Sequence, residues 1–132
     1  IVGFFSVLND KITSEDAPSG KFWEKNFKNK FHDRKRYKSY PSVKIGKLGI
    51  NKNYQGNGIG TILLDYVKNF FIDNNKTGCR FLTVDAYNNE KTLKFYEKNN
   101  FEYLPSKKTD EKDLTRLMYY DLASIKNSLN IL

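Results

Sequence analysis

The chain has 132 residues, a formal net charge of +8 at pH 7, 39% hydrophobic residues and 15% aromatic residues. This length fits one domain over residues 1–132, and the apolar share can build one core despite the charge. A single cysteine, Cys79, excludes an internal disulfide and a four-cysteine zinc site, so no metal site is predicted and a reducing, cytoplasmic location is expected. No apolar run approaches the roughly 20 residues that cross a bilayer, which predicts no membrane association. The positive charge favours polyanionic partners without choosing among them.

Hydrophobic periodicity and turn residues divide the chain into alternating extended and helical segments. The predicted elements are a strand over 1–8, a loop over 9–20, a helix over 21–33, a basic stretch ending at Pro41, a strand over 42–50, a glycine-rich loop over 51–60, a helix over 61–75, a strand over 79–87 buried on both faces, a helix over 88–100, and closing strands over 101–104 and 113–122. The order predicts an α/β (α+β) fold in which a mixed central sheet, with a parallel pair of strands in its middle, is flanked by helices. Because the chain opens on a strand without a methionine, we expect N-terminal elements of the natural fold to be missing.

The strongest chemical signal is the loop from Tyr54 to Gly60, which reads YQGNGIG between a predicted strand and a predicted helix. Its glycines let the backbone approach a ligand, and the first amides of the next helix are unpaired donors for an anion. Thr61 and Ile62 follow the last glycine, which excludes a Walker A loop and a dinucleotide fingerprint. Taken alone, the glycine cluster fits a flexible turn equally well.

In its context this loop, within KLGINKNYQGNGIGTILLD, closely resembles the glycine-loop motif of the Gcn5-related N-acetyltransferases, the GNAT family. A second stretch, VDAYNNEKTLKFYEKNNFEYL, resembles the family in having Asn89 seven residues before Tyr96. The family's Gly-Phe turn here reads Asn100-Phe101, and asparagine keeps the left-handed conformation accessible. The two motifs together cover residues 43–104.

The resemblance implies the GNAT fold, acetyl-coenzyme A as cofactor and N-acetyltransferase activity. It implies that loop amides hold the cofactor pyrophosphate, that the preceding strand end lies along the pantetheine arm, and that Asn89 contacts the cofactor. The implied cofactor-binding residues are Leu48, Gly49, Ile50, Gln55, Gly56, Asn57, Gly58, Ile59, Gly60, Thr61 and Asn89.

Tyr96 is the predicted general acid, because a tyrosine, with a pKa near 10, can protonate a leaving thiolate at neutral pH. Without the motif, a core aromatic would be the preferred interpretation. Phe95 and Tyr96 point in different directions on a helix, so we expect one of them in the core and the other in the site.

A general base is harder to assign. The candidates are Asp85, Glu90 and Glu102, each of which also fits a solvated surface charge. An α-amine, with a pKa of about 7.7–8.0, could attack without a strong base, which favours an α-amine acceptor. His32 is expected to be exposed and non-catalytic, and Cys79 to be an inert core thiol.

Within the family, the chain most resembles the tRNA-acetylating toxins of toxin/antitoxin systems, which implies the α-amine of aminoacyl-tRNA as acceptor and an antitoxin as partner. Basic residues dominate between residues 21 and 47, and tyrosines lie among them, which fits electrostatic and stacking contacts to RNA or a lysine-rich connector. The predicted nucleic-acid-binding residues are Arg34, Lys35, Arg36 and Lys38. A small-molecule or protein N-acetyltransferase, a non-catalytic acyl-coenzyme-A-binding module and a homodimer remain open.

Overall fold

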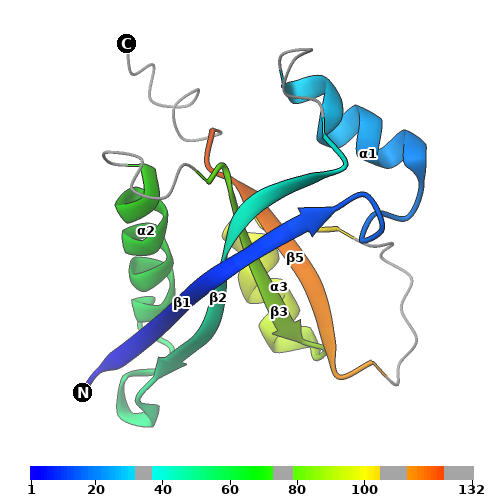
Figure 1. The fold of residues 1–132 in the computed structure, drawn as a ribbon. Helices are drawn as coiled ribbons and strands as arrows, with labels where there is room; N and C mark the ends of the chain where they lie inside the picture. Colours follow the sequence, from blue (N-terminus) through cyan, green and yellow to red (C-terminus); the bar gives the residue numbers. More distant parts are fainter. Residues whose placement is uncertain (32–36, 73–78, 105–112, 124–132) are drawn as a thin grey trace.

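The computed structural model describes residues 1–31, 37–72, 79–104 and 113–123, which form one five-stranded sheet with three helices (Figure 1). The elements are β1 (Gly3–Thr13), α1 (Gly20–Asn26), η1 (Lys28–Lys30), β2 (Ser39–Ile50), η3 (Lys52–Tyr54), α2 (Ile59–Ile72), β3 (Phe81–Tyr87), α3 (Glu90–Lys98), β4 (Glu102–Tyr103) and β5 (Thr115–Asp121). Among the described residues, no helix is both long and apolar enough to cross a membrane.

The strand order of the sheet is β1-β2-β3-β5-β4. Only β2 and β3 pair in parallel, and α2 connects them; every other neighbouring pair is antiparallel. This arrangement confirms the predicted mixed sheet with a central parallel pair. It places the glycine-rich loop directly after β2, at the carboxyl end of a central strand.

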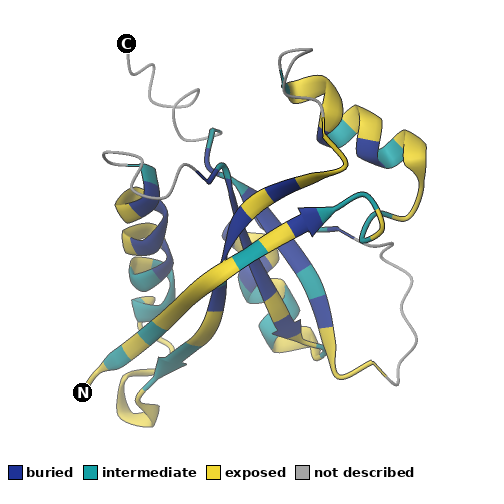
Figure 2. Cartoon of the chain, in the orientation of Figure 1, coloured by how far each residue is buried: buried dark blue, intermediate teal, exposed yellow. Residues whose placement is uncertain are grey.

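Two buried clusters lie on the two faces of the sheet. The larger one forms where α2 and α3 pack on the sheet through Leu64, Val67 and Tyr96, so the helices bury the apolar sides that their sequence periodicity predicts (Figure 2). The smaller one is aromatic and lies under α1, where the Trp23 and Phe27 rings stack with centroids 4.7 Å apart. No other helix of the described residues covers that second sheet face.

Several element boundaries differ from the prediction by a few residues, and the first strand and the first helix differ most. The first strand continues to Thr13, because β1 pairs with β2 from Gly3 opposite Ile50 to Thr13 opposite Ser39, and this pairing overrides the turn-prone sequence after residue 8. The helix predicted over 21–33 ends at Asn26 and is followed by a single 3₁₀ turn.

Strand β3 is less covered than its apolar sequence suggests. Residues Phe81 to Val84 are buried, but Asp85 and Tyr87 are exposed, because neither α1 nor any other described element covers this end of the second face. The prediction of burial on both faces therefore fails for the last part of the strand. The exposed end is the part that borders the candidate site.

Candidate functional site

A cleft opens where β2 and β3 separate. The two strands pair from Ser42 opposite Phe81 to Ile45 opposite Val84 and no further, although both continue. At this point the β1–β2 register jumps by one residue, which makes Gly46 the extra residue of a β-bulge. Bulges bend a strand, so the bulge turns β2 away from β3 and leaves the ladder groups of both strand ends free for another partner.

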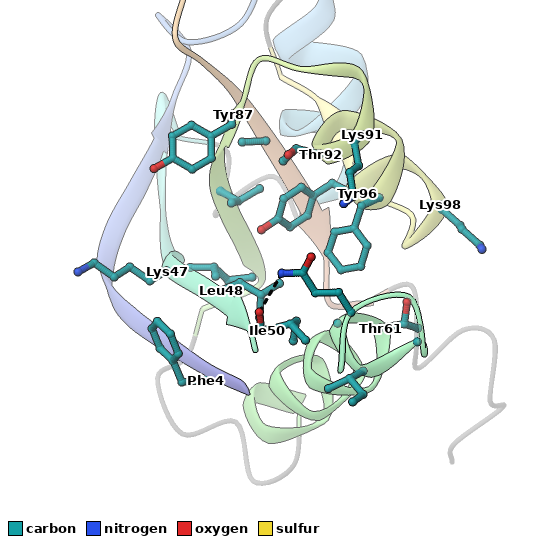
Figure 3. Close-up of a pocket in the computed structure, with 18 of the residues that line it drawn as sticks. Phe4, Lys47, Leu48, Ile50, Thr61, Tyr87, Lys91, Thr92, Tyr96 and Lys98 are labelled. Carbon is teal, nitrogen blue, oxygen red and sulfur yellow. Dashed lines mark hydrogen bonds between the residues drawn. The ribbon is translucent and has the colours of Figure 1, made fainter. Parts of the chain in front are cut away.

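The resulting cleft has a volume of about 840 Å³ and runs between the strand ends, the glycine-rich loop and α3 (Figure 3). Eight of the eleven predicted cofactor-binding residues line it, together with Tyr96. They are Leu48, Ile50, Gln55, Gly56, Gly58, Ile59, Gly60 and Thr61. The structure therefore brings most of the predicted site residues to one place. Gly49, Asn57 and Asn89 do not line the cleft.

The loop presents its backbone to this cleft. Gly56 and Gly58 have φ angles of +85° and +76°, a region that side chains disfavour, and open space surrounds both. The first bond of the α2 ladder runs from the Ile62 amide to the Gly58 carbonyl. The three amides before it, of Ile59, Gly60 and Thr61, have no acceptor among the described residues, so they are available as donors to an anion.

Side chains of the loop fasten it to the strand end. The Gln55 amide nitrogen donates to the Ile50 carbonyl at 3.0 Å, and the Asn57 amide nitrogen donates to the Tyr54 carbonyl at 3.3 Å. Both side chains therefore bond within the loop and shape it, so the groups that the loop can offer to a ligand are mainly those of its backbone.

Tyr96 extends from α3 into the cleft with its hydroxyl toward the strand ends (Figure 3). The residue is only 6% exposed, and this burial raises the pKa of Tyr96 to about 12. Its hydroxyl has no hydrogen-bond partner in the part of the chain that the structure describes. The phenol is thus protonated at neutral pH and free to donate to a ligand.

The sequence predicts one of Phe95 and Tyr96 in the core and the other in the site, but both residues line the cleft. The two rings meet edge to face with centroids 5.1 Å apart. The Phe95 ring lies against the start of α2, where a Cβ added to Gly60 would come within 2.9 Å of it. Gly60 thus serves close packing of the helix start against α3.

Asn89 caps α3. Its side-chain oxygen accepts a hydrogen bond from the Thr92 amide at 2.9 Å, the usual contact of an asparagine at a helix N-cap. At the other end of the helix, Asn100 adopts a φ of 69°, the left-handed conformation predicted there. Asn89 therefore helps to place the helix that carries Tyr96.

Of the three candidate bases, only Asp85 lines the cleft. Its carboxylate lies 2.7 Å from the Lys44 ammonium, which is also 3.3 Å from Asp10. Partial burial lowers the pKa of Lys44, but the hydrogen bond and charge of Asp85, joined by Asp10, outweigh it and raise the pKa. Glu90 pairs with Lys94, and Glu102 accepts from the Tyr119 hydroxyl.

Three lysines that belong to neither sequence motif's predicted contacts also line the cleft, namely Lys47, Lys91 and Lys98. Lys91, Phe95 and Lys98 recur at i, i+4 and i+7, a spacing that places them on one side of α3 and could have revealed them. These cations suit a ligand with several phosphate charges.

The predicted nucleic-acid contacts are only partly described. Lys38 is exposed, whereas Arg34, Lys35, Arg36 and His32 lie outside the described residues. Tyr40 is buried in the smaller aromatic cluster and stacks on Phe31 with centroids 4.0 Å apart, so it cannot stack on a base as expected. Tyr37, which is 56% exposed, keeps that capacity.

Separated parallel strands, a glycine-rich amide cradle and a buried tyrosine define an acyl-coenzyme-A-type transferase fold. The model of the acetyltransferase (GNAT) family matches residues 16–101, and the chain belongs to this family. A search of curated protein sequences found no match.

Solved structures with the same fold include AtaT complexed with acetyl-methionyl-tRNAfMet, at 24% identity and a TM-score of 0.72 over 97% of this chain. A tyrosine-to-phenylalanine mutant of KacT is 26% identical, with a TM-score of 0.70 over 96% of the chain. AtaTR bound with acetyl-coenzyme A is 25% identical, with a TM-score of 0.65 over 97%. The chain spans 66% of each of these solved chains, just under two thirds of their length.

Proposed function

We propose that the protein is an N-acetyltransferase that moves the acetyl group of acetyl-coenzyme A to a primary amine. The observation that carries this proposal is the meeting of three features in one cleft: unpaired strand ends, the amides of Ile59 to Thr61, and the free hydroxyl of Tyr96. The family match and the acetyl-coenzyme A in the AtaTR structure support the choice of cofactor.

Each wall of the cleft suits one part of that molecule. The amides before Ile62 suit the pyrophosphate, and Lys91 and Lys98 add positive charge beside them. The ladder groups of β2 that β3 no longer pairs, from Leu48 to the Ile50 amide, suit the amides of the pantetheine arm as an added strand would, while the Ile50 carbonyl already accepts from Gln55.

When bound, acetyl-coenzyme A supplies an activated acetyl thioester. The backbone amides at the end of β2 stabilise negative charge on the carbonyl oxygen as the amine attacks. As the C–N bond forms and the C–S bond breaks, the Tyr96 hydroxyl gives its proton to the departing sulfur, and the proton that the amine nitrogen loses restores the phenol through solvent. Phe95 and Tyr96 line that end of the cleft.

For the acceptor, we propose the α-amine of an aminoacyl-tRNA, as for a toxin of a type II toxin/antitoxin module. AtaT and KacT, the neighbours named above, support this choice, since AtaT was solved with acetyl-methionyl-tRNAfMet and, as a mutant, with the C-terminus of its antitoxin AtaR. The net charge of +8 and the basic segment between residues 21 and 47 fit a polyanionic acceptor. The cleft holds no carboxylate free of a lysine partner among the described residues, which fits an amine that is partly neutral at pH 7.

The test is to incubate the purified protein with labelled acetyl-coenzyme A and, in parallel, charged tRNA, uncharged tRNA, small amines and a lysine peptide. We expect label only in the charged tRNA, with a rate that falls steeply as salt rises. Label in the amines or the peptide would replace the acceptor and keep the chemistry. Absence of coenzyme A binding by calorimetry would overturn the enzymatic proposal itself.

A further inference from the structure

Asn99, a buried residue after the end of α3, links both helices of the site. Its side-chain nitrogen donates to the Phe95 carbonyl at 2.8 Å and to the Thr61 hydroxyl oxygen at 3.3 Å. Thr61 belongs to the first turn of α2 and lines the cleft (Figure 3). Asn99 therefore joins the helix that carries Tyr96 to the helix start that presents the free amides.

Lys68 holds the same residue from a second point on α2. Its ammonium donates to the Asn99 carbonyl at 2.6 Å and lies 4.1 Å from the Tyr120 ring centroid. Burial lowers the pKa of Lys68, and the nearby Asp65 opposes this. Lys68 is only 4% exposed, so the bond is shielded from water and fixes the backbone of Asn99 against α2.

The hydrogen-bond directions follow from the partners. A carbonyl oxygen can only accept, so the Asn99 atom facing the Phe95 carbonyl is its amide nitrogen. The same nitrogen faces Thr61, which makes the Thr61 oxygen an acceptor. The Thr61 hydroxyl keeps its own proton for a different acceptor, and none lies within the described residues.

We propose that Asn99 is a positioning residue that turns the Thr61 hydroxyl into a donor for the pyrophosphate of coenzyme A. The hydroxyl then adds a fourth donor to the amides of Ile59, Gly60 and Thr61. This inference rests on the proposed function, since it assigns a role within the same cofactor site. Because the Asn99 amide nitrogen donates to the hydroxyl oxygen, the hydroxyl proton is directed away from Asn99 before the ligand arrives.

Two isosteric substitutions test the link. Thr61→Val removes the hydroxyl, and Asn99→Leu removes the amide that orients it. We expect each to weaken coenzyme A binding about tenfold in calorimetry, the effect of one lost hydrogen bond to a charged group. The double variant should bind no worse than Thr61→Val alone, because Asn99 acts through Thr61. Thr61→Ser should bind like the unaltered protein.

A second ligand separates positioning from folding. Pantetheine lacks the pyrophosphate, so its affinity, measured by chemical-shift titration, should be unchanged in all these variants. Asn26→Leu is the matched control, because Asn26 makes the same amide bond to the carbonyl four residues earlier, at 3.0 Å, in α1. If Asn99→Leu does not fold, the smaller Asn99→Ala replaces it.

The inference is overturned if the Asn99 variant binds coenzyme A normally, if the two effects add fully, or if pantetheine affinity falls by the same factor. Those outcomes leave the proposed function intact, since the unaltered protein still binds coenzyme A. Failure of the unaltered protein to bind coenzyme A would instead remove the proposed function.

Discussion

The two walls of the cleft are built from different kinds of group. The loop wall, formed by Gln55–Thr61 and α3, offers backbone amides, one protected phenol and the ammonium groups of Lys91 and Lys98. The strand wall, formed by the ends of β2 and β3 with Lys47, Asp85 and Tyr87, offers exposed side chains. Backbone donors keep their geometry when a ligand arrives, whereas exposed side chains adjust to it. The backbone groups of the loop wall are therefore suited to the constant phosphates of the cofactor, and the exposed side chains of the strand wall are suited to the acceptor.

Of the substitutions that test the two walls, loss of the Tyr96 hydroxyl should have the largest effect on the rate of acetyl transfer. We expect Tyr96→Phe to lower kcat about 100-fold or more, the usual contribution of a positioned general acid. The affinity for coenzyme A should change little, because the ring and its packing on Phe95 and Phe101 remain. Steady-state acetyl transfer and calorimetry measure the two quantities.

Tyr66→Phe serves as the control for that substitution, because Tyr66 is 56% exposed on α2 and lies outside the cleft lining. An unchanged kcat in Tyr96→Phe would show that the leaving group is protonated by water or by the strand wall.

The pH dependence of kcat/KM should distinguish the ionisation of the acceptor amine from that of the general acid. Below about pH 7.7, kcat/KM for an α-amine acceptor should rise about tenfold per pH unit as the amine loses its proton. It should then level off and show no descending limb up to pH 10, since the pKa of Tyr96 is about 12 and the phenol keeps its proton throughout. Initial rates between pH 6 and 10 measure the profile.

A descending limb between pH 8 and 10 would contradict this expectation. It would mean that a group with an ordinary or lowered pKa, and not Tyr96, donates the proton.

The geometry of the loop wall can be tested at Gly58, whose φ is +76° in open space. Gly58→Ala adds no clash and forces only the backbone, at a cost of about 1–2 kcal/mol. We expect coenzyme A binding to weaken about tenfold in calorimetry, with the acceptor KM unchanged. Gly58→Asn should lose less, because asparagine tolerates this conformation.

Gly20→Ala is the matched control for the glycine substitution. An added Cβ there meets nothing within 4 Å, its φ lies outside the strained region, and it opens α1 away from the cleft. Equal losses in both variants would show that the measured effect concerns folding and not the loop.

The same division explains what the sequence could reveal. The loop wall is local: a glycine motif, a helix period and one asparagine-to-tyrosine spacing predicted Gly58, Gly60, Thr61 and the placement of Tyr96 in the cleft. The contacts that complete it are not local. Lys68 reaches a carbonyl 31 residues away, and nothing in either segment's periodicity distinguishes this lysine from a solvated one.

The strand wall was less predictable for the same physical reason. Thr83 donates to Asp10, 73 residues away, and Lys44 bridges Asp10 to Asp85 across three strands. These residues meet only because β1 runs beside β2 to Thr13, a pairing set by the sheet and opposed by the local turn signals.

Asp85→Asn should have the smallest effect, and it tests whether the strand wall contributes chemistry or only contact. The Asp85 side chain is 46% exposed and its ion pair with Lys44 is partly solvated, so its loss should raise the acceptor KM about two- to fivefold. Coenzyme A affinity and kcat should stay the same, because Lys44 retains Asp10 as a partner. Glu90→Gln, which breaks the exposed pair with Lys94, is the control and should leave the acceptor KM, the coenzyme A affinity and kcat unchanged.

A loss of kcat/KM above about 50-fold in Asp85→Asn would instead identify this carboxylate as a general base. The strand wall would then take part in the reaction itself, and an acceptor with a higher pKa than an α-amine would become the better fit.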